Sequence, residues 1–295
     1  MSQVDVLWIV AMMVIATGIM WTQRRKMAKT EVDRLVARGG LPPERDLVES
    51  ALKWYERRQA VLLLGLLAGT LAGGAIVVLA YVGMDIGFET GAVIDVRLLT
   101  WMVAAASAAG GIATLGLSYR TVRASRIDGP RMAALRPRRL SDYLSPIEIA
   151  IHYGSLVLPL VAVGLGIVVL GSNDKPVRGW ILIGSGLAAV PLWAVGAALQ
   201  RMALRVNQPS GRQAELHWQE ALRATTLRDL GSSMITVSWL LGASIPMSFQ
   251  WPADAPAFAE PLSEVLFLVA VGLMCVMWGV AASRRGLQRV QRVVG

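Results

Sequence analysis

The chain has 295 residues, of which 55% are hydrophobic and 17% are charged, and its formal net charge is +9. Soluble domains carry about 25% charged residues, so the composition argues against an ordinary soluble domain. The positive charge could suggest a nucleic-acid partner, but Lys and Arg fall almost wholly in alternate connections between apolar runs. That distribution is typical of a membrane topology signal and not of a phosphate-binding face. We therefore predict an all-α, polytopic integral membrane bundle that binds no nucleic acid.

The first apolar run covers residues 6–21 and is followed at once by a basic stretch that includes Arg24 and Arg25. A secretory signal peptide carries its positive residues before the apolar stretch, so this run predicts an uncleaved anchor with an outer N-terminus. Six further runs are each about 20 residues or longer, which is enough to cross a hydrocarbon core of about 30 Å. The seven predicted spans are approximately 6–21, 60–83, 98–119, 149–171, 179–199, 230–249 and 262–282.

The basic residues give these spans an orientation. Of the 29 Lys and Arg residues, 26 lie in segments 23–59, 120–148 and 200–229 or after residue 282. The exceptions are Arg97, Lys175 and Arg178. Because cytoplasmic loops carry the excess of Lys and Arg, we predict an outer N-terminus and a cytoplasmic C-terminus. The dominance of arginine, with abundant Ala, Val and Gly, resembles the coding bias of a high-GC bacterium, so we expect a bacterial plasma membrane.

The three basic segments contain amphipathic stretches. After Pro42-Pro43 the sequence predicts a helix through Arg58. The apolar stripe of this helix consists of Leu47, Ala51, Trp54 and Tyr55. Such stretches typically lie flat on the membrane, near anionic lipid headgroups, and a docking surface for a partner is the alternative. Since the longest connections have about 30 to 40 residues, too few for an ordinary soluble domain, we predict a single membrane domain over residues 1–295.

The start of the fourth span is marked by the sequence Ser145-Pro146-Ile147-Glu148, which predicts a helix N-terminus with a capping box and Pro at the first helical position. Close helix packing is predicted in the second span, where glycines recur every four residues and let another helix approach. The ladder and its expected partner surface in the third span are Gly65, Gly69 and Gly73 opposite Ala104, Ser107, Ala108 and Gly111. A homodimer is the alternative use of this ladder.

Candidate polar groups lie near the cytoplasmic ends of the spans. Charged residues inside a membrane commonly mark function, but the span centres contain no Asp, Glu, Lys or Arg. Glu148 and His152 are one helical turn apart, and with Asp229 they could form a polar cluster at the cytoplasmic boundary. A capping Glu and an interfacial His are the simpler interpretation. Because the two histidines and Cys275 show no metal-ligand spacing and no reaction motif is present, we predict no catalytic residue, metal or cofactor.

Prolines and hydroxyl groups could instead mark a permeation path or a kink. The candidates are Pro159, Pro191, Pro246, Ser233 and Thr236. The absence of a reaction motif and the small-residue ladder favour a non-enzymatic scaffold, anchor or assembly subunit. Its expected partners are anionic membrane lipids and another membrane protein or a second copy of the chain. A small transporter or channel for a neutral or apolar solute is the alternative. A membrane-embedded enzyme, with a polar cluster of Glu148, His152 and Asp229 at the cytoplasmic boundary, is the third hypothesis.

Overall fold

The computed structural model describes residues 3–83, 96–124, 138–171, 176–205 and 212–244, with the single positions 257, 261, 262, 265, 268, 269, 272 and 276. Within these ranges every regular element is a helix and there is no strand, so the all-α prediction is confirmed for this part of the chain. The elements are α1 (Gln3–Gly39), α2 (Arg45–Gly83), α3 (Val96–Ala124), α4 (Leu140–Tyr143), α5 (Pro146–Gly154), α6 (Val157–Gly171), α7 (Pro176–Arg205), α8 (Gln213–Trp239) and the π-helical turn η1 (Leu240–Ser244).

Three helical stretches are long and apolar enough to cross a membrane, by length and composition. They are Arg45–Ala75, Pro146–Gly171 and Gly179–Arg205. These stretches overlap the spans predicted at 60–83, 149–171 and 179–199. The predicted spans 6–21 and 98–119 fall on α1 and α3. The described part of the span predicted at 230–249, which ends at residue 244, falls on α8 and η1. The span predicted at 262–282 lies outside the described residues, apart from single positions.

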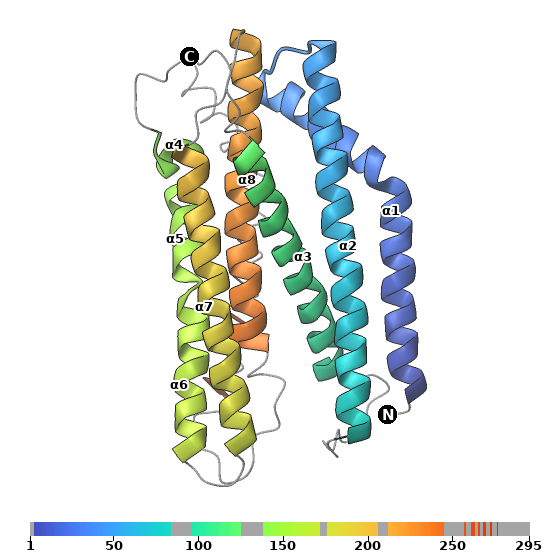
Figure 1. The fold of residues 1–295 in the computed structure, drawn as a ribbon, viewed down its shortest axis with the longest axis vertical. Helices are drawn as coiled ribbons and strands as arrows, with labels where there is room; N and C mark the ends of the chain where they lie inside the picture. Colours follow the sequence, from blue (N-terminus) through green and yellow to red (C-terminus); the bar gives the residue numbers. More distant parts are fainter. Residues whose placement is uncertain are drawn as a thin grey trace.

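Helix α8 is the central element of the bundle. It packs against α2, α3, α5, α6 and α7. In Figure 1 the helices α1, α2 and α3 stand on one side of α8, and α4 to α7 stand on the other. On the first side α1 packs on α2 and α2 on α3, whereas on the second side α6 packs on α7. The two groups of helices therefore meet mainly through α8.

The second and third helices approach closely through small residues. A Cβ atom added at Gly69 would stand 2.4 Å from the carbonyl oxygen of Ala105 and 2.7 Å from the Cα atom of Ala106. At Gly65 an added Cβ would stand 2.8 Å from the carbonyl oxygen of Ala109. No larger residue fits without moving a backbone, which is the use of glycine in a close helix crossing.

The remaining residues of the expected small surfaces lie elsewhere on the same helices. Gly111 lies against α8, where the groups nearest to an added Cβ belong to Ser233 and Val237. Gly73 is buried and Ala108 is half-buried, while the side chain of Ala104 lies outside the described residues. The contact with α2 therefore uses a face of α3 that is rotated from the predicted one.

Helices α1, α2 and α8 continue past the apolar part and form a core of their own, which we call the three-helix end. Its buried members are Ala28, Val32, Leu35, Leu41, Ala51, Tyr55, Trp218 and Ala221. Gly40, whose φ of 58° suits glycine, turns the chain between α1 and α2. The indole Nε1 of Trp218 donates to the carbonyl oxygen of Pro42 at 3.0 Å, which fixes this turn on α8.

The apolar stripe expected to lie on the membrane belongs to this core. Ala51 and Tyr55 are buried, and Leu47 and Trp54 pack against them. The stripe is covered by buried side chains of α1 and α8, which are Ala28, Val32, Leu35, Trp218 and Ala221. Burial between helices thus replaces the expected contact with lipid for this segment.

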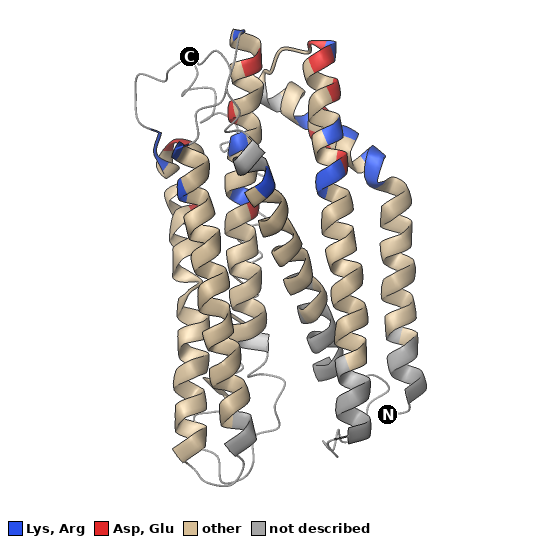
Figure 2. Cartoon of the chain, in the orientation of Figure 1, with Lys and Arg blue, Asp and Glu red and all other residues tan. Residues whose placement is uncertain are grey.

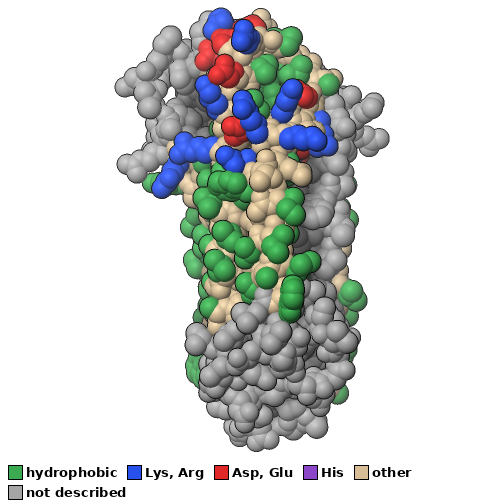
Figure 3. Space-filling view, turned by 90° about the vertical axis from the view of Figure 1, so that its right-hand side faces the viewer, with side chains coloured by type: hydrophobic (Ala, Val, Ile, Leu, Met, Phe, Trp, Pro, Cys, Tyr) green, Lys and Arg blue, Asp and Glu red, His purple; other side chains and the backbone are tan. Residues whose placement is uncertain are grey.

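Charge and apolar surface are separated along the bundle. Described Lys, Arg, Asp and Glu side chains gather toward one end (Figure 2). Below them the outer surface is apolar (Figure 3), with large exposed side chains on several helices. Examples are Met12, Ile15, Leu64, Ile167 and Leu187, each at least 53% exposed. A soluble protein rarely exposes so much contiguous apolar surface, so the arrangement is that of a membrane protein.

Candidate functional site: polar contacts around helix α8

Glu148 and His152 lie one helical turn apart on α5, and both are buried. The predicted capping box is confirmed: the Ser145 hydroxyl accepts from the Glu148 backbone N–H, and the Glu148 carboxylate accepts from that of Ser145. The other carboxylate oxygen, Oε1, accepts from Nε of Arg228 at 3.0 Å. Glu148 therefore caps α5 and ties it to α8 at the same time.

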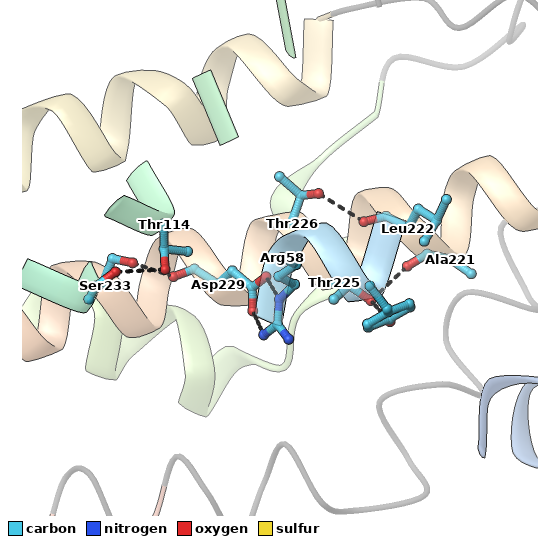
Figure 4. Close-up of polar contacts among 10 residues, drawn as sticks. Arg58, Thr114, Ala221, Leu222, Thr225, Thr226, Asp229 and Ser233 are labelled. Atoms are coloured by element: carbon cyan, nitrogen blue, oxygen red, sulfur yellow. Dashed lines mark hydrogen bonds and ion pairs between the residues drawn. The ribbon is translucent and has the colours of Figure 1, made fainter. Parts of the chain in front are cut away.

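Asp229 faces the opposite direction from its neighbour Arg228. Its carboxylate accepts two hydrogen bonds from the guanidinium of Arg58 on α2, as Figure 4 shows. One turn earlier on α8, the Thr225 hydroxyl lies 3.2 Å from the hydroxyl of Tyr55. The structure therefore brings Glu148 and His152 together with Arg228, and places Asp229 in a separate contact with α2.

A buried ion cluster that the sequence did not reveal lies nearer the charged end. The Glu220 carboxylate on α8 accepts from Arg138 at 2.8 Å, from Arg223 at 3.0 Å and from the Tyr143 hydroxyl at 2.6 Å. The side chains of Glu220 and Arg223 are 3% and 2% exposed. Burial, and then the negative charge of Glu220, raise the pKa of Tyr143 to about 12, so its phenol stays protonated and donates. The only sequence signal is the i,i+3 spacing of Glu220 and Arg223, which is common on exposed helices.

His152 is packed against a glycine on α8. A Cβ added at Gly231 would stand 1.8 Å from the imidazole Cε1, so the ring occupies the space that any side chain there would need. The Gln200 amide nitrogen, Nε2, donates to the carbonyl oxygen of Leu227 at 3.2 Å and lies 3.4 Å from His152 Nδ1. Because that amide nitrogen can only donate, this contact favours the tautomer in which Nδ1 accepts and the ring carries its hydrogen on Nε2. Neither this Nε2 nor the Gln200 Oε1 has a partner among the described residues.

The helix that begins at Pro146 is interrupted between α5 and α6. Pro159 has no N–H for the Ser155 carbonyl, which accepts from Leu158 at 3.2 Å instead. The freed carbonyl of His152 accepts from the Ser155 hydroxyl at 2.8 Å and from Nε1 of Trp193 at 3.2 Å. The backbone of Leu158 and Pro159 also lies against Gly242 in η1. The interruption between α5 and α6 is therefore in contact with the π-helical turn that follows α8.

The other candidates for a path or kink are scattered. Pro191 is exposed on α7, which continues through it, and Pro246 lies outside the described residues. The Ser233 hydroxyl is buried and donates to the backbone carbonyl of Asp229 in its own helix at 2.9 Å. Thr236 is half-buried on α8. Of the described candidates, Pro159 lies on α6, Pro191 on α7, and Ser233 and Thr236 on α8.

Comparison of the chain with protein-family models, with curated proteins and with solved structures finds no match. Among the described residues there is also no group of three His, Cys, Asp or Glu side chains that could hold a metal ion. The chemistry that the geometry does show is the joining of helices. Carboxylates of α5 and α8 accept from arginines of α8 and α2, and the Gln200 amide of α7 donates to a backbone carbonyl of α8.

The contact between Arg58 and Asp229 is expected to contribute strongly to stability, because their side chains are only 20% and 13% exposed. Replacing Arg58→Met leaves the Asp229 carboxylate without its partner and should lower the free energy of unfolding by about 3 kcal/mol. The double variant Arg58→Met/Asp229→Leu should recover most of that loss. Unfolding in mild detergent measures both.

The matched control is Lys53→Met, whose ion pair with Glu49 is exposed and should contribute less than about 0.5 kcal/mol. Equal losses in the Arg58 and Lys53 variants, or a double variant that is worse than either single one, would contradict a structural role for the pair.

The tautomer of His152 can be read directly, because the chain has only two histidines. In His217→Asn protein labelled with ¹⁵N-histidine, the single remaining imidazole should show a protonated Nε2 and an unprotonated Nδ1 by NMR. Gln200→Leu removes the amide that fixes this choice and should give a mixture of tautomers. A protonated Nδ1 in the His217→Asn protein would show that the Gln200 contact is wrong.

Proposed function

We propose that the chain is a seven-span protein of the bacterial plasma membrane, with an outer N-terminus and a cytoplasmic C-terminus, which acts as a non-enzymatic scaffold or assembly subunit. Its placement of 26 of 29 Lys and Arg residues in alternate connections supports the topology. The gathering of described charges at one end of the bundle agrees with that orientation (Figure 2).

The observation that carries the assembly role is the three-helix end. It extends beyond the apolar surface, and Val32, Tyr55 and Trp218, each 2% or 3% exposed, form part of its core. Within this end, the hydrogen bond from Trp218 to Pro42 holds the α1–α2 turn on α8, and the ion pair between Arg58 and Asp229 holds α2 on α8. A rigid projecting surface loses little conformational entropy when a partner binds. A segment that only anchored the chain on lipid would have no need of such a core.

A bulky substitution on the three-helix end tests this role. Ser50 on α2 and Ser141 on α4 are both exposed, but only Ser50 belongs to the three-helix end. The tagged protein, purified from its native membrane in mild detergent, should retain a stoichiometric protein partner. Ser50→Trp should reduce that partner by about tenfold, which corresponds to about 1.4 kcal/mol of lost contact, whereas Ser141→Trp should retain it.

Recovery of the chain without any protein partner, or a partner held equally by both tryptophan variants, would contradict an assembly role of the three-helix end. Mass spectrometry of the purified material distinguishes these outcomes.

A transporter or channel for a small neutral or apolar solute is the second candidate, and the interruption between α5 and α6 favours it. Interrupted helices with freed carbonyls form solute sites in many transporters. Trp193 donates to the freed carbonyl of His152, so Trp193→Phe should slow the flux of a solute such as glycerol or urea into proteoliposomes several-fold.

Trp180→Phe is the control for this flux measurement, because Trp180 lies on the same helix and is 63% exposed. Flux no faster than that of protein-free liposomes for both solutes, or equal slowing by both variants, would contradict a path at the interruption.

A further inference from the structure

The cations of the bundle fall into two groups according to the direction in which they point. Inward-pointing arginines bind carboxylates of neighbouring elements or of their own helix. Arg58 binds Asp229, Arg228 binds Glu148, and Arg138 and Arg223 share Glu220. These four arginines therefore bind three buried or half-buried carboxylates, which balance most of their charge within the protein.

Outward-pointing cations are not neutralised in this way. Those near the boundary between the charged and apolar surfaces are Arg24, Lys26, Lys29, Arg57, Arg120, Arg139, Arg201 and Arg205. All are exposed except Arg24, which is half-buried. None of them forms an ion pair with a carboxylate of the described residues. They come from α1, α2, α3 and α7 and from the residue before α4, so they are spread over both groups of helices. Figure 2 shows described Lys and Arg residues on both sides of α8. We call them the outer cation ring.

The ring is densest on α1 and α2, where it directly adjoins apolar surface (Figure 3). Ile19 is 55% exposed and Met20 is 37% exposed, and both precede the first cations of α1 by about one turn. The Arg24 guanidinium lies 4.5 Å from the centroid of the Trp21 ring and donates to the Trp21 carbonyl oxygen at 3.0 Å. Indole rings prefer the headgroup region of a bilayer, so Trp21 and Arg24 fit the position where phosphate meets acyl chain.

We propose that the outer cation ring binds the phosphates of anionic phospholipids, with its main site on α1 and α2. A phospholipid matches both features of this surface, because its headgroup meets the cations while its acyl chains cover Ile19 and Met20. An acidic protein would match the charge but not the apolar residues below it, and it would approach one side and not the whole ring. The inference rests on the proposed membrane residence, and it is independent of the assembly role.

Two triple variants remove equal charge from different places. Lys26→Gln/Lys29→Gln/Arg57→Gln neutralises the α1–α2 part of the ring. The control, Arg34→Gln/Lys53→Gln/Arg212→Gln, neutralises exposed cations that already bind carboxylates at the three-helix end. The protein in mild detergent is titrated with phosphatidylglycerol or with phosphatidylcholine of the same chains, and bound lipid is counted by native mass spectrometry.

Wild-type protein and the control should prefer phosphatidylglycerol, and the ring variant should lose about fivefold in affinity for that lipid for each charge removed. Equal binding of the two lipids by wild-type protein, or equal losses in both variants, would overturn the proposal.

Binding of polyglutamate that displaces phosphatidylglycerol at equal charge concentration would assign the surface to an acidic protein instead. Failure of wild-type protein to insert into phosphatidylcholine vesicles would overturn the membrane residence itself, whereas insertion without lipid preference would overturn only the lipid site.

Discussion

Two consecutive residues of α8 form ion pairs with helices on opposite sides of it and so hold the bundle together. Arg228 reaches to Glu148 on α5, and Asp229 reaches to Arg58 on α2. Removing a charge from water is costly unless a partner of opposite sign is supplied, so each of these side chains is stable in its place only while the neighbouring helix stays where it is. Since α1–α3 and α4–α7 meet mainly through α8, this adjacent pair of charges fixes how the two groups of helices are positioned on it.

Close backbone contacts at glycines also hold the helices together, in addition to the ion pairs. Gly231 follows Asp229 by two residues and leaves room for the His152 ring, and Gly111 lets α3 approach α8 near Ser233. Such contacts matter in a membrane because the hydrophobic effect does not drive helices together in lipid. Close packing and hydrogen bonds must stabilise their association instead. In the apolar part of the bundle, helix contacts therefore depend on small residues. At the charged end, the three-helix end is instead held by an ordinary apolar core around Tyr55 and Trp218.

The sequence was informative wherever the signal is local. Apolar runs predicted the helices, and Ser145 to Glu148 predicted the N-terminus of α5, because capping involves residues three apart. The ladder of Gly65 and Gly69 lies against α3, since consecutive helices of a hairpin pack together. The rotation of α3 was not predictable, because small residues occur around much of that helix. The partners of Asp229 and Glu220 were not predictable either, because Arg58 and Arg138 are 171 and 82 residues away and charge alone does not select among many arginines.

The interruption at Ser155 shows why local irregularity does not decide between a scaffold and a transporter. A carbonyl freed inside a membrane helix must find a donor, and here Ser155 and Trp193 both provide one. Thus the kink itself leaves no unsatisfied backbone group at His152. Among the described residues, His152 Nε2 and Gln200 Oε1 have no hydrogen-bond partner, and the His152 ring packs tightly against Gly231. Movement of Gly231 and the rest of α8 away from α5 would uncover the His152 ring. The ion pair of Arg228 with Glu148 opposes that motion, so the same contact that stabilises a scaffold would have to open in a transporter.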